Sequence, residues 1–324
     1  MSDTLGTTSR ARLFASNGNP IPEGAKVGYQ DTSDGISLRY ARWEATEKPT
    51  KGTVILLHGR AESIEKYYET IGELTRRGFG VLSFDWRGQG GSSRMISDHR
   101  KGYVEHFNHY LIDLETILTE VALPDCRGPY YIFAHSTGGL VALLAGPALT
   151  NRIQRMVLSS PLIRFGTLPM KQETLHKILG AMFFTGLGQI QLSSGASDPS
   201  KRAFSGNRIT SDSRRFYRNK NIVQNHPKLG IGAPTAAWLF AASRAMLQIS
   251  TQEHIASLNV PTLLVAAGGD RVVSSPAIEK YGARMRSGNF LTVDGSRHEI
   301  FQERDEFREQ LLAAFDAFVP GADS

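Results

Sequence analysis

Short apolar segments bounded by glycine, proline and polar turn residues alternate along the chain with longer amphipathic segments. The apolar segments are mostly continuous and lack the strict alternation of a strand that has one face in water. They predict buried, mainly parallel strands that are connected by helices. The six predicted strands cover residues 53–59, 80–86, 129–136, 155–161, 261–268 and 289–295.

Helical periodicity marks the segments between or after several of these strands. Apolar residues recur at helical spacing over residues 63–78, where Gly78 supplies a helix-stop signal. Residues 104–121 and 305–319 have the same amphipathic pattern. Alternating residues over 36–45 predict antiparallel strands at one edge of the sheet. The pattern as a whole predicts an α/β fold with a mostly parallel central sheet flanked by helices.

One long segment, residues 165–250, interrupts the strand–helix rhythm. It contains apolar helical pieces at 179–190 and 235–247, separated by a polar and basic stretch, and no strand is predicted in it. We interpret it as a helical cap inserted between two core strands. The core is then predicted to comprise residues 1–164 and 251–324.

Composition narrows the class of protein. The chain has 324 residues, of which 40% are hydrophobic, enough for a large core. A net charge of +6 is mild, so a nucleic-acid partner is not expected. The single cysteine, Cys126, excludes an internal disulfide or a cysteine-based zinc cluster. No apolar signal region begins the sequence, and apolar runs such as 139–149 are shorter than a membrane-spanning helix needs. A soluble or peripheral protein of the cytoplasm is expected.

Candidate chemistry centres on an apolar strand, a tight turn and a glycine-rich helix start within residues 130–146. This is the pattern of a nucleophile elbow, G-x-S-x-G, in which small residues flank the serine because strand and helix backbones approach closely. Ala134 replaces the first glycine, whereas Gly138 keeps the far side small. Ser136 is the predicted nucleophile.

The partners of a nucleophilic serine follow in the expected order. A predicted strand ends at Asp270, and the loop after the last predicted strand carries His298. Such a histidine takes the serine proton, and a carboxylate orients the ring. Asp294, four residues before the histidine, is the competing carboxylate, but the strand-end position favours Asp270. The order Ser, Asp, His is that of α/β-hydrolases.

An oxyanion hole is predicted from backbone N–H groups. In this fold one donor is the residue after the nucleophile, here Thr137. The second comes from the loop after the early strand that ends at His58 and Gly59, and Arg60 is the predicted donor.

The predicted cap carries a basic run over residues 201–220, with seven Lys or Arg side chains against one acid, Asp212. Such a run could bind a phosphate head group or an anionic membrane surface, although a solvated face or a salt-bridged helix is the more common reason for one. The residues predicted to contact substrate are Arg208, Arg214, Arg215 and Trp238. Apolar cap residues could line an acyl pocket or pack the cap onto the core: Met182, Phe183, Phe184, Trp238, Leu239 and Phe240.

Other chemistries fit poorly. Residues 88–93 are glycine-rich but lack the helix-start context of a nucleotide-binding loop. His106 and His109 lie three apart without an evident third ligand, so a metal site is not expected.

Five motifs together resemble one family, the monoacylglycerol lipase and bacterial lysophospholipase branch of the α/β-hydrolases. They are HGRAES (58–63), FDWRGQGGSS (84–93), AHSTGG (134–139), GGDRVV (268–273) and GSRHE (295–299). The resemblance implies an eight-stranded core, a helical cap, and hydrolysis of a fatty-acyl ester without metal or cofactor. It also implies that the second motif, which includes Asp85 and Arg87, is structural rather than catalytic.

The resulting hypothesis is a lysophospholipase, with lysophospholipid favoured over monoacylglycerol as substrate. A broad carboxylesterase and an acyltransferase with the same triad remain alternatives. A binding protein that kept the fold without activity is the alternative outside enzymes, because fold alone does not establish activity. Head-group preference and oligomeric state are not determined by the sequence.

Overall fold

The computed structural model describes residues 11–167, 170–192, 199–201 and 203–320, and its core is an eight-stranded sheet. The strand order is β1-β2-β4-β3-β5-β6-β7-β8. Only β1 and β2 run antiparallel to their neighbours, and all other pairs are parallel. The strands are β1 (Lys26–Asp31), β2 (Ser37–Trp43), β3 (Thr53–Leu57), β4 (Gly80–Phe84), β5 (Tyr130–His135), β6 (Ile153–Ser159), β7 (Thr262–Ala267) and β8 (Gly288–Val293).

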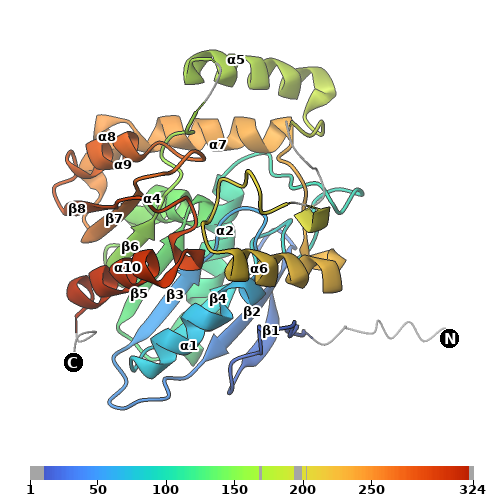
Figure 1. Ribbon diagram of the computed structural model, residues 1–324. Helices are drawn as coiled ribbons and strands as arrows, with labels where there is room; N and C mark the ends of the chain where they lie inside the picture. Colours follow the sequence, from blue (N-terminus) through green and yellow to red (C-terminus); the bar gives the residue numbers. More distant parts are fainter. Residues whose placement is uncertain (1–10, 168–169, 193–198, 202, 321–324) are drawn as a thin grey trace.

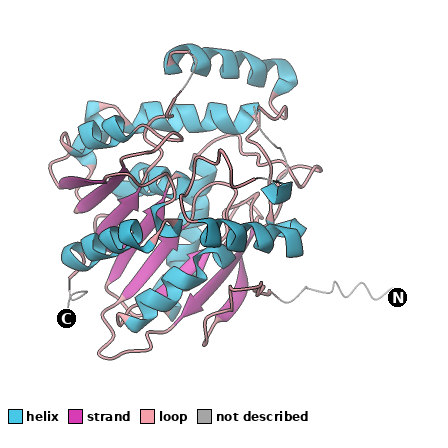
Figure 2. Ribbon diagram, in the orientation of Figure 1, coloured by secondary structure: helices cyan, strands magenta, loops and turns pink. Residues whose placement is uncertain are grey.

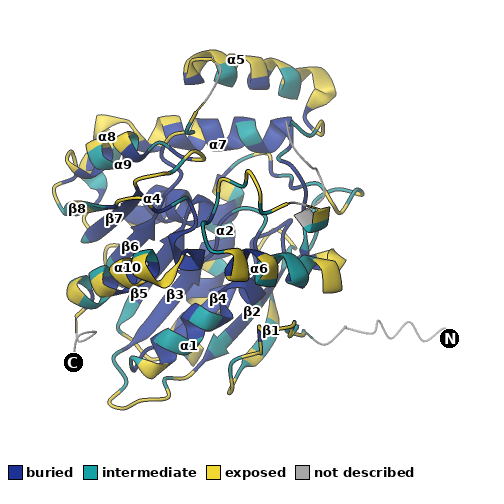
Figure 3. Ribbon diagram, viewed as in Figure 1, coloured by how far each residue is buried: buried dark blue, intermediate teal, exposed yellow. Residues whose placement is uncertain are grey.

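Helices cover both faces of this sheet (Figures 1 and 2). Successive residues of the inner strands therefore enter different apolar clusters. In β3, Ile55 and Leu57 join one cluster, while Val54 and Leu56 join the other. Every residue of the inner strands β3, β4 and β7 is buried, and Figure 3 shows the centre of the sheet in the colour of buried residues. The helices of the core are α1 (Tyr68–Arg76), α2 (Asn108–Ile117), α3 (Leu123–Asp125), α4 (Thr137–Leu149), α8 (Gln252–Ser257), α9 (Ser275–Gly282) and α10 (Asp305–Phe318). Short helical turns are η1 (Ile64–Tyr67), η2 (Leu118–Ala122) and η6 (Ile300–Gln302).

The α/β fold predicted from the hydrophobic pattern is confirmed. All six predicted parallel strands are present, and the edge pair β1–β2 lies where residues 36–45 indicated antiparallel strands. The eight-stranded core implied by the resemblance is also present.

The glycine-rich loop after β4 is held by its own aspartate. Asp85 is fully buried and accepts hydrogen bonds from the backbone N–H groups of Ile64 and Gly91, at 3.0 and 2.7 Å. Its carboxylate also pairs with the buried guanidinium of Arg39. These contacts support the structural role implied for this motif, since they join the loop to β2 and to η1.

The segment between β6 and β7 holds three longer helices, α5 (Gln172–Met182), α6 (Ser213–Asn225) and α7 (Ala236–Ile249), with turns η3 (Phe183–Leu187), η4 (Pro199–Lys201) and η5 (Pro227–Leu229). No strand occurs between β6 and β7 in the residues described there. Helix α5 packs on α7 at the edge of the molecule (Figure 1). Helix α7 contributes Trp238 and Met246 to the main apolar cluster. The boundaries at residues 165 and 250 stay a prediction.

Helix α6 lies in and after the basic stretch, where the periodicity predicted no apolar helix and a salt-bridged helix was one alternative. Its N-terminus is capped by Asp212, whose carboxylate accepts the backbone N–H of Arg215 at 2.9 Å. Phe216 and Ile222 are the buried apolar residues of its inner face. So few apolar residues among many basic ones give a weak amphipathic signal, and the helix depends on contacts with distant residues.

Candidate active site

Ser136 lies in a sharp turn between β5 and α4. Its backbone has φ 50° and ψ −110°, a strained conformation for a residue other than glycine. The turn requires a small residue at Gly138, because a Cβ there would come within 2.5 Å of the carbonyl oxygen of Leu57. At position 134 the strand tolerates alanine, which is fully buried. This is the strand–turn–helix geometry of a nucleophile elbow.

Two hydrogen bonds connect Ser136 to a histidine and a carboxylate. His298 Nε2 lies 3.0 Å from Ser136 Oγ, and His298 Nδ1 lies 2.7 Å from Asp270 Oδ2. The other carboxylate oxygen of Asp270 accepts the backbone N–H groups of Val272 and Val273, which fixes its orientation. Asp294 is exposed, so Asp270 is the carboxylate that the fold brings to the histidine.

The electrostatic setting suits a histidine that gains a proton during a reaction. Burial is the largest single influence and disfavours the imidazolium of His298, but the charge and hydrogen bond of Asp270, together with the charges of Glu299 and Glu62, outweigh burial and raise the pKa of His298. Burial alone would raise the pKa of Asp270, yet its contact with His298 lowers it. Because the carboxylate stays ionised, it can hold the imidazole in one tautomer and stabilise the protonated ring.

The loop after β3 lies beside the serine and has a defined backbone. Gly59 donates its N–H to Glu62 Oε2 at 2.6 Å, and Ala61 donates its N–H to Gln89 Oε1 at 2.7 Å. Ala61 has a positive φ of 60°, so the chain reverses at this point. Arg60, a predicted oxyanion donor, lies between these two fixed amides.

Thr137, the other predicted oxyanion donor, is the first residue of α4. N–H groups in the first turn of a helix have no partner within the helix and carry its positive dipole end. The backbone at this position can therefore face an anion that forms on the substrate.

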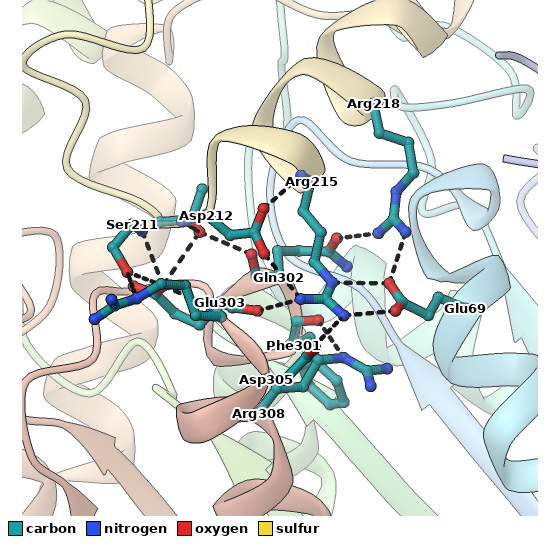
Figure 4. A network of polar contacts seen from close by, with 12 residues as sticks. Glu69, Ser211, Asp212, Arg215, Arg218, Phe301, Gln302, Glu303, Asp305 and Arg308 are labelled. Atoms are coloured by element: carbon teal, nitrogen blue, oxygen red, sulfur yellow. Dashed lines mark hydrogen bonds and ion pairs between the residues drawn. The ribbon is translucent and has the colours of Figure 1, made fainter. Parts of the chain in front are cut away.

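Arg215 does not have the environment of a head-group ligand, contrary to the sequence-based expectation. Its side chain is 2% exposed and forms ion pairs with Glu69, Asp212 and Asp305. It also donates to the backbone oxygen of Glu303 at 2.8 Å. Figure 4 shows the guanidinium surrounded by these acceptors. Its charge is already satisfied, so we correct the prediction: Arg215 joins α6 to α1 and to the start of α10.

The other three predicted substrate contacts are dispersed. Arg208 and Arg214 are exposed, and Arg214 lines a groove with Tyr217 and residues 17–23 rather than with the serine. Trp238 is 3% exposed and donates its ring N–H to the hydroxyl of Tyr110. The guanidinium of Arg60 lies 5.2 Å from the centre of the Trp238 ring. Trp238 is thus a core residue that contacts Arg60 in the loop after β3.

The apolar cap residues divide between packing and exposure. Phe183 and Phe240 lie in the small cluster that packs α5 onto α7, whereas Phe184 is 78% exposed. Packing between α5 and α7 therefore accounts for part of the set that the sequence suggested as an acyl pocket.

Sequence reasoning missed a buried polar cluster next to the triad. Glu62, Lys66 and Glu299 meet there, beside His135. Burial lowers the pKa of His135 to about 3, so this ring stays neutral at ordinary pH. The spacing of Glu62 and Lys66, one helical turn apart within the HGRAESIEK segment, was the only signal in the sequence.

Fold and site together define a serine hydrolase of the α/β-hydrolase class, with the candidate nucleophile on the turn after β5 and the candidate base on a loop after β8. Comparison with known families agrees. The chain belongs to the Hydrolase_4 family, described as serine aminopeptidase, S33, whose model matches residues 48–305.

Relatives of known name lie in the branch that the sequence motifs indicated. Lysophospholipase L2 of Escherichia coli is 29% identical over 293 residues, which cover 88% of this chain and 84% of that protein. Monoglyceride lipase of Rattus norvegicus is 29% identical over 303 residues, covering 90% and 91%. A soluble variant of monoglyceride lipase from Saccharomyces cerevisiae, solved with a substrate analog, has a TM-score of 0.71 at 21% identity, covering 92% and 96%. The resemblance to this branch is confirmed.

Proposed function

We propose that this protein is a lysophospholipase, which hydrolyses the fatty-acyl ester of a single-chain phospholipid through an acyl-enzyme. The hydrogen-bonded chain from Ser136 through His298 to Asp270 carries the proposal, because a binding protein has no need for an aligned base and acid. The names of the relatives support a lipid ester as the substrate.

The proposed mechanism uses only groups of this chain. Ser136 Oγ attacks the ester carbonyl while His298 takes its proton and Asp270 stabilises the imidazolium. The oxyanion accepts hydrogen bonds from the backbone N–H groups of Arg60 and Thr137. His298 then returns the proton to the departing alcohol. Water, activated by the same histidine, releases the fatty acid and regenerates the serine.

A cavity under α6 supports a substrate with both polar and apolar parts. It borders the oxyanion loop at Arg60 and Ala61. Phe216, Ile222 and Leu229 are apolar residues of its lining, and Lys66 and Lys220 are charged ones. We propose that this cavity receives part of the lipid. Exposed Arg208 and Arg214 remain proposed contacts for an anionic head group, with Arg214 in a separate groove beside Tyr217.

The proposed function is tested by fatty-acid release from substrates with matched acyl chains. Lysophospholipid, monoacylglycerol and short p-nitrophenyl esters are each compared, with Ser136→Ala as the inactive control. We expect the fastest turnover with lysophospholipid. Faster turnover of monoacylglycerol would favour the alternative that the monoglyceride lipase relatives suggest. Absence of labelling by a fluorophosphonate would refute a serine hydrolase altogether.

Peripheral contact with an anionic membrane, at the inner face of a cytoplasmic membrane, is also part of the proposal. None of the described helices is long and apolar enough to cross a bilayer. Figure 3 shows much of α5 exposed, and the exposed large apolar residues on or next to α5 and η3 are Met170, Ile178, Phe184, Leu187 and Ile190. An exposed apolar patch of this kind suits a lipid surface.

The contact is tested by sedimentation with vesicles that contain anionic phospholipid. Phe184→Ser and Leu187→Ser together should reduce binding, whereas Phe290→Ser, at an exposed apolar residue on β8, is the matched control. Equal binding by all variants would contradict contact through the cap.

A further inference from the structure

A lysine is buried between two carboxylates directly beside the candidate active site. Lys66 Nζ lies 2.6 Å from Glu62 Oε1 and 2.7 Å from Glu299 Oε1. The three side chains are 11%, 4% and 9% exposed. Burying charges is costly even when they are paired, so a site that keeps three of them invites a functional explanation.

A metal ion is not the explanation that fits best. Ligand atoms of Glu62, His135 and Glu299 lie within 4.8 Å of one another, a spacing that could suit a cation. The ammonium of Lys66, however, already lies in contact with both carboxylates. Burial disfavours that charge, but Glu299 and Glu62 outweigh it and raise the pKa of Lys66, so the lysine itself is the cation of the cluster.

One end of the cluster holds the oxyanion loop. Glu62 Oε2 accepts the backbone N–H of Gly59 at 2.6 Å and the hydroxyl of Tyr67 at 2.7 Å. Gly59 immediately precedes Arg60, the proposed oxyanion donor. Rotation of the Glu62 carboxylate would therefore release the backbone that positions this donor. Lys66 prevents the rotation by binding the other oxygen of the same carboxylate.

The other end of the cluster holds the loop of the general base. Glu299 directly follows His298, and its backbone N–H donates to Ile209 O at 2.8 Å. Gln302, on the turn after Glu299, donates to the backbone oxygen of Lys66 at 3.1 Å. Main chain and side chain of Lys66 thus both contact this loop.

The cluster also contributes to the field at His298. The charged or titratable groups that face this ring are Asp270, Glu299, Glu62 and His135, with Lys66 behind the carboxylates. After burial and Asp270, the negative charges of Glu299 and Glu62 are the next influences on His298, and both favour the imidazolium.

We propose that Lys66 is a positioning residue that joins Glu62, which holds the oxyanion loop, to Glu299, which follows the general base. The two loops then keep a fixed spacing around Ser136. Catalysis depends on such spacing because donors must be in place where the oxyanion forms. The inference rests on the proposed function, since it assigns roles around the same serine.

The first test replaces the lysine and measures fluorophosphonate labelling and ester hydrolysis. In Lys66→Met, one of the two facing carboxylates should take up a proton, because like charges this close do not both stay ionised. The bridge is lost while the net charge of the cluster is kept. We expect labelling and kcat to fall about 10- to 100-fold, the range seen when residues behind metal-binding histidines are replaced. Lys66 also lines the cavity proposed to receive part of the lipid, so KM is measured with a short p-nitrophenyl ester, for which kcat should fall more than KM changes.

The second test separates charge from geometry. Glu299→Gln removes one negative charge near His298, so the acid limb of the pH profile should move to lower pH. Lys66→Met should leave the limb in place, and Lys66→Arg, which can still bind two carboxylates, should regain part of the rate.

Asp113→Asn is the matched control, because it breaks a buried ion pair with Arg87 in a different part of the core. It should lower the unfolding temperature without changing the pH profile. If Lys66→Met only lowers stability, as this control does, and labels at the wild-type rate, the positioning role is refuted. If the wild type itself is not labelled, the proposed function fails first. If the wild type is labelled but does not hydrolyse lysophospholipid, the proposed substrate is wrong. The labelling rate of Lys66→Met relative to wild type then still decides the positioning role.

Discussion

Replacing Arg215 by methionine separates the two roles that its position suggests. The guanidinium binds Glu69 through two nitrogens, at 2.9 and 2.6 Å, and also contacts Asp212 and Asp305 (Figure 4). Methionine keeps much of the apolar stem but none of these bonds. The substitution therefore leaves three carboxylates with less compensation at the junction of α6, α1 and α10.

The expected loss of stability follows from burial of the partners. Removing one member of a fully buried ion pair costs about 3–5 kcal/mol. Asp305 is 63% exposed and can be solvated, and Glu69 keeps a 2.6 Å contact with Arg218. We therefore expect a smaller loss of about 2–3 kcal/mol. For a chain of this length that corresponds to a decrease of about 3–4 °C in Tm.

The assay is thermal and urea unfolding of the purified variant, followed by lipid hydrolysis well below its Tm. Arg214→Met is the matched control for stability, because Arg214 is the neighbouring residue and its side chain is exposed. This substitution should change the free energy of unfolding by no more than about 0.5 kcal/mol. The ratio of lysophospholipid to monoacylglycerol turnover should be unchanged in Arg215→Met. Unchanged stability with selective loss of lysophospholipid turnover would refute this reasoning and restore Arg215 as a head-group ligand.

Three further predictions concern the candidate triad. The pKa of His298 is raised, and the base must be neutral to take the serine proton, so activity should fall as pH drops through that pKa. A pH profile of kcat/KM measures this fall, and constant activity through the acid range would contradict the assignment. Asp270→Asn should lower kcat by about 10⁴-fold, whereas Asp294→Asn should stay near wild type, and similar losses in both would contradict the observed geometry. Gly138→Ala should abolish fluorophosphonate labelling or folding, because its Cβ meets the backbone of Leu57; normal labelling of a folded variant would mean that the elbow can widen.

The main features of the fold could be predicted because they depend on local patterns. Continuous apolar runs such as that in β7 indicate strands covered on both faces, and the order of strands and helices then limits the topology. The candidate nucleophile, acid and base were identifiable for a related reason. In a parallel sheet, residues that follow the carboxyl ends of strands lie at the same edge, so Ser136, Asp270 and His298 could be expected to meet.

The tertiary structure shows which of two similar residues makes a contact, in one case as the sequence favoured and in the other against it. Asp270 and Asp294 both follow strands, yet only the first lies against His298, because the chain turns there with its carboxylate fixed by two backbone amides. Arg214 and Arg215 are adjacent and chemically identical in the sequence. One is exposed and the other buried among carboxylates, since helical geometry points neighbouring side chains in different directions.

The polar cluster around Lys66 shows the same limit of sequence reasoning. Glu62 and Lys66 are four residues apart and could be paired from the sequence, but Glu299 comes from the far end of the chain. Local composition determined the strands, the helices of strong periodicity and the serine elbow. Contacts between distant residues determined the position of α6, the burial of Arg215 and the contact of Lys66 with both the loop after β3 and the loop of His298. The reason is that the energy of a buried charge depends on every group packed around it.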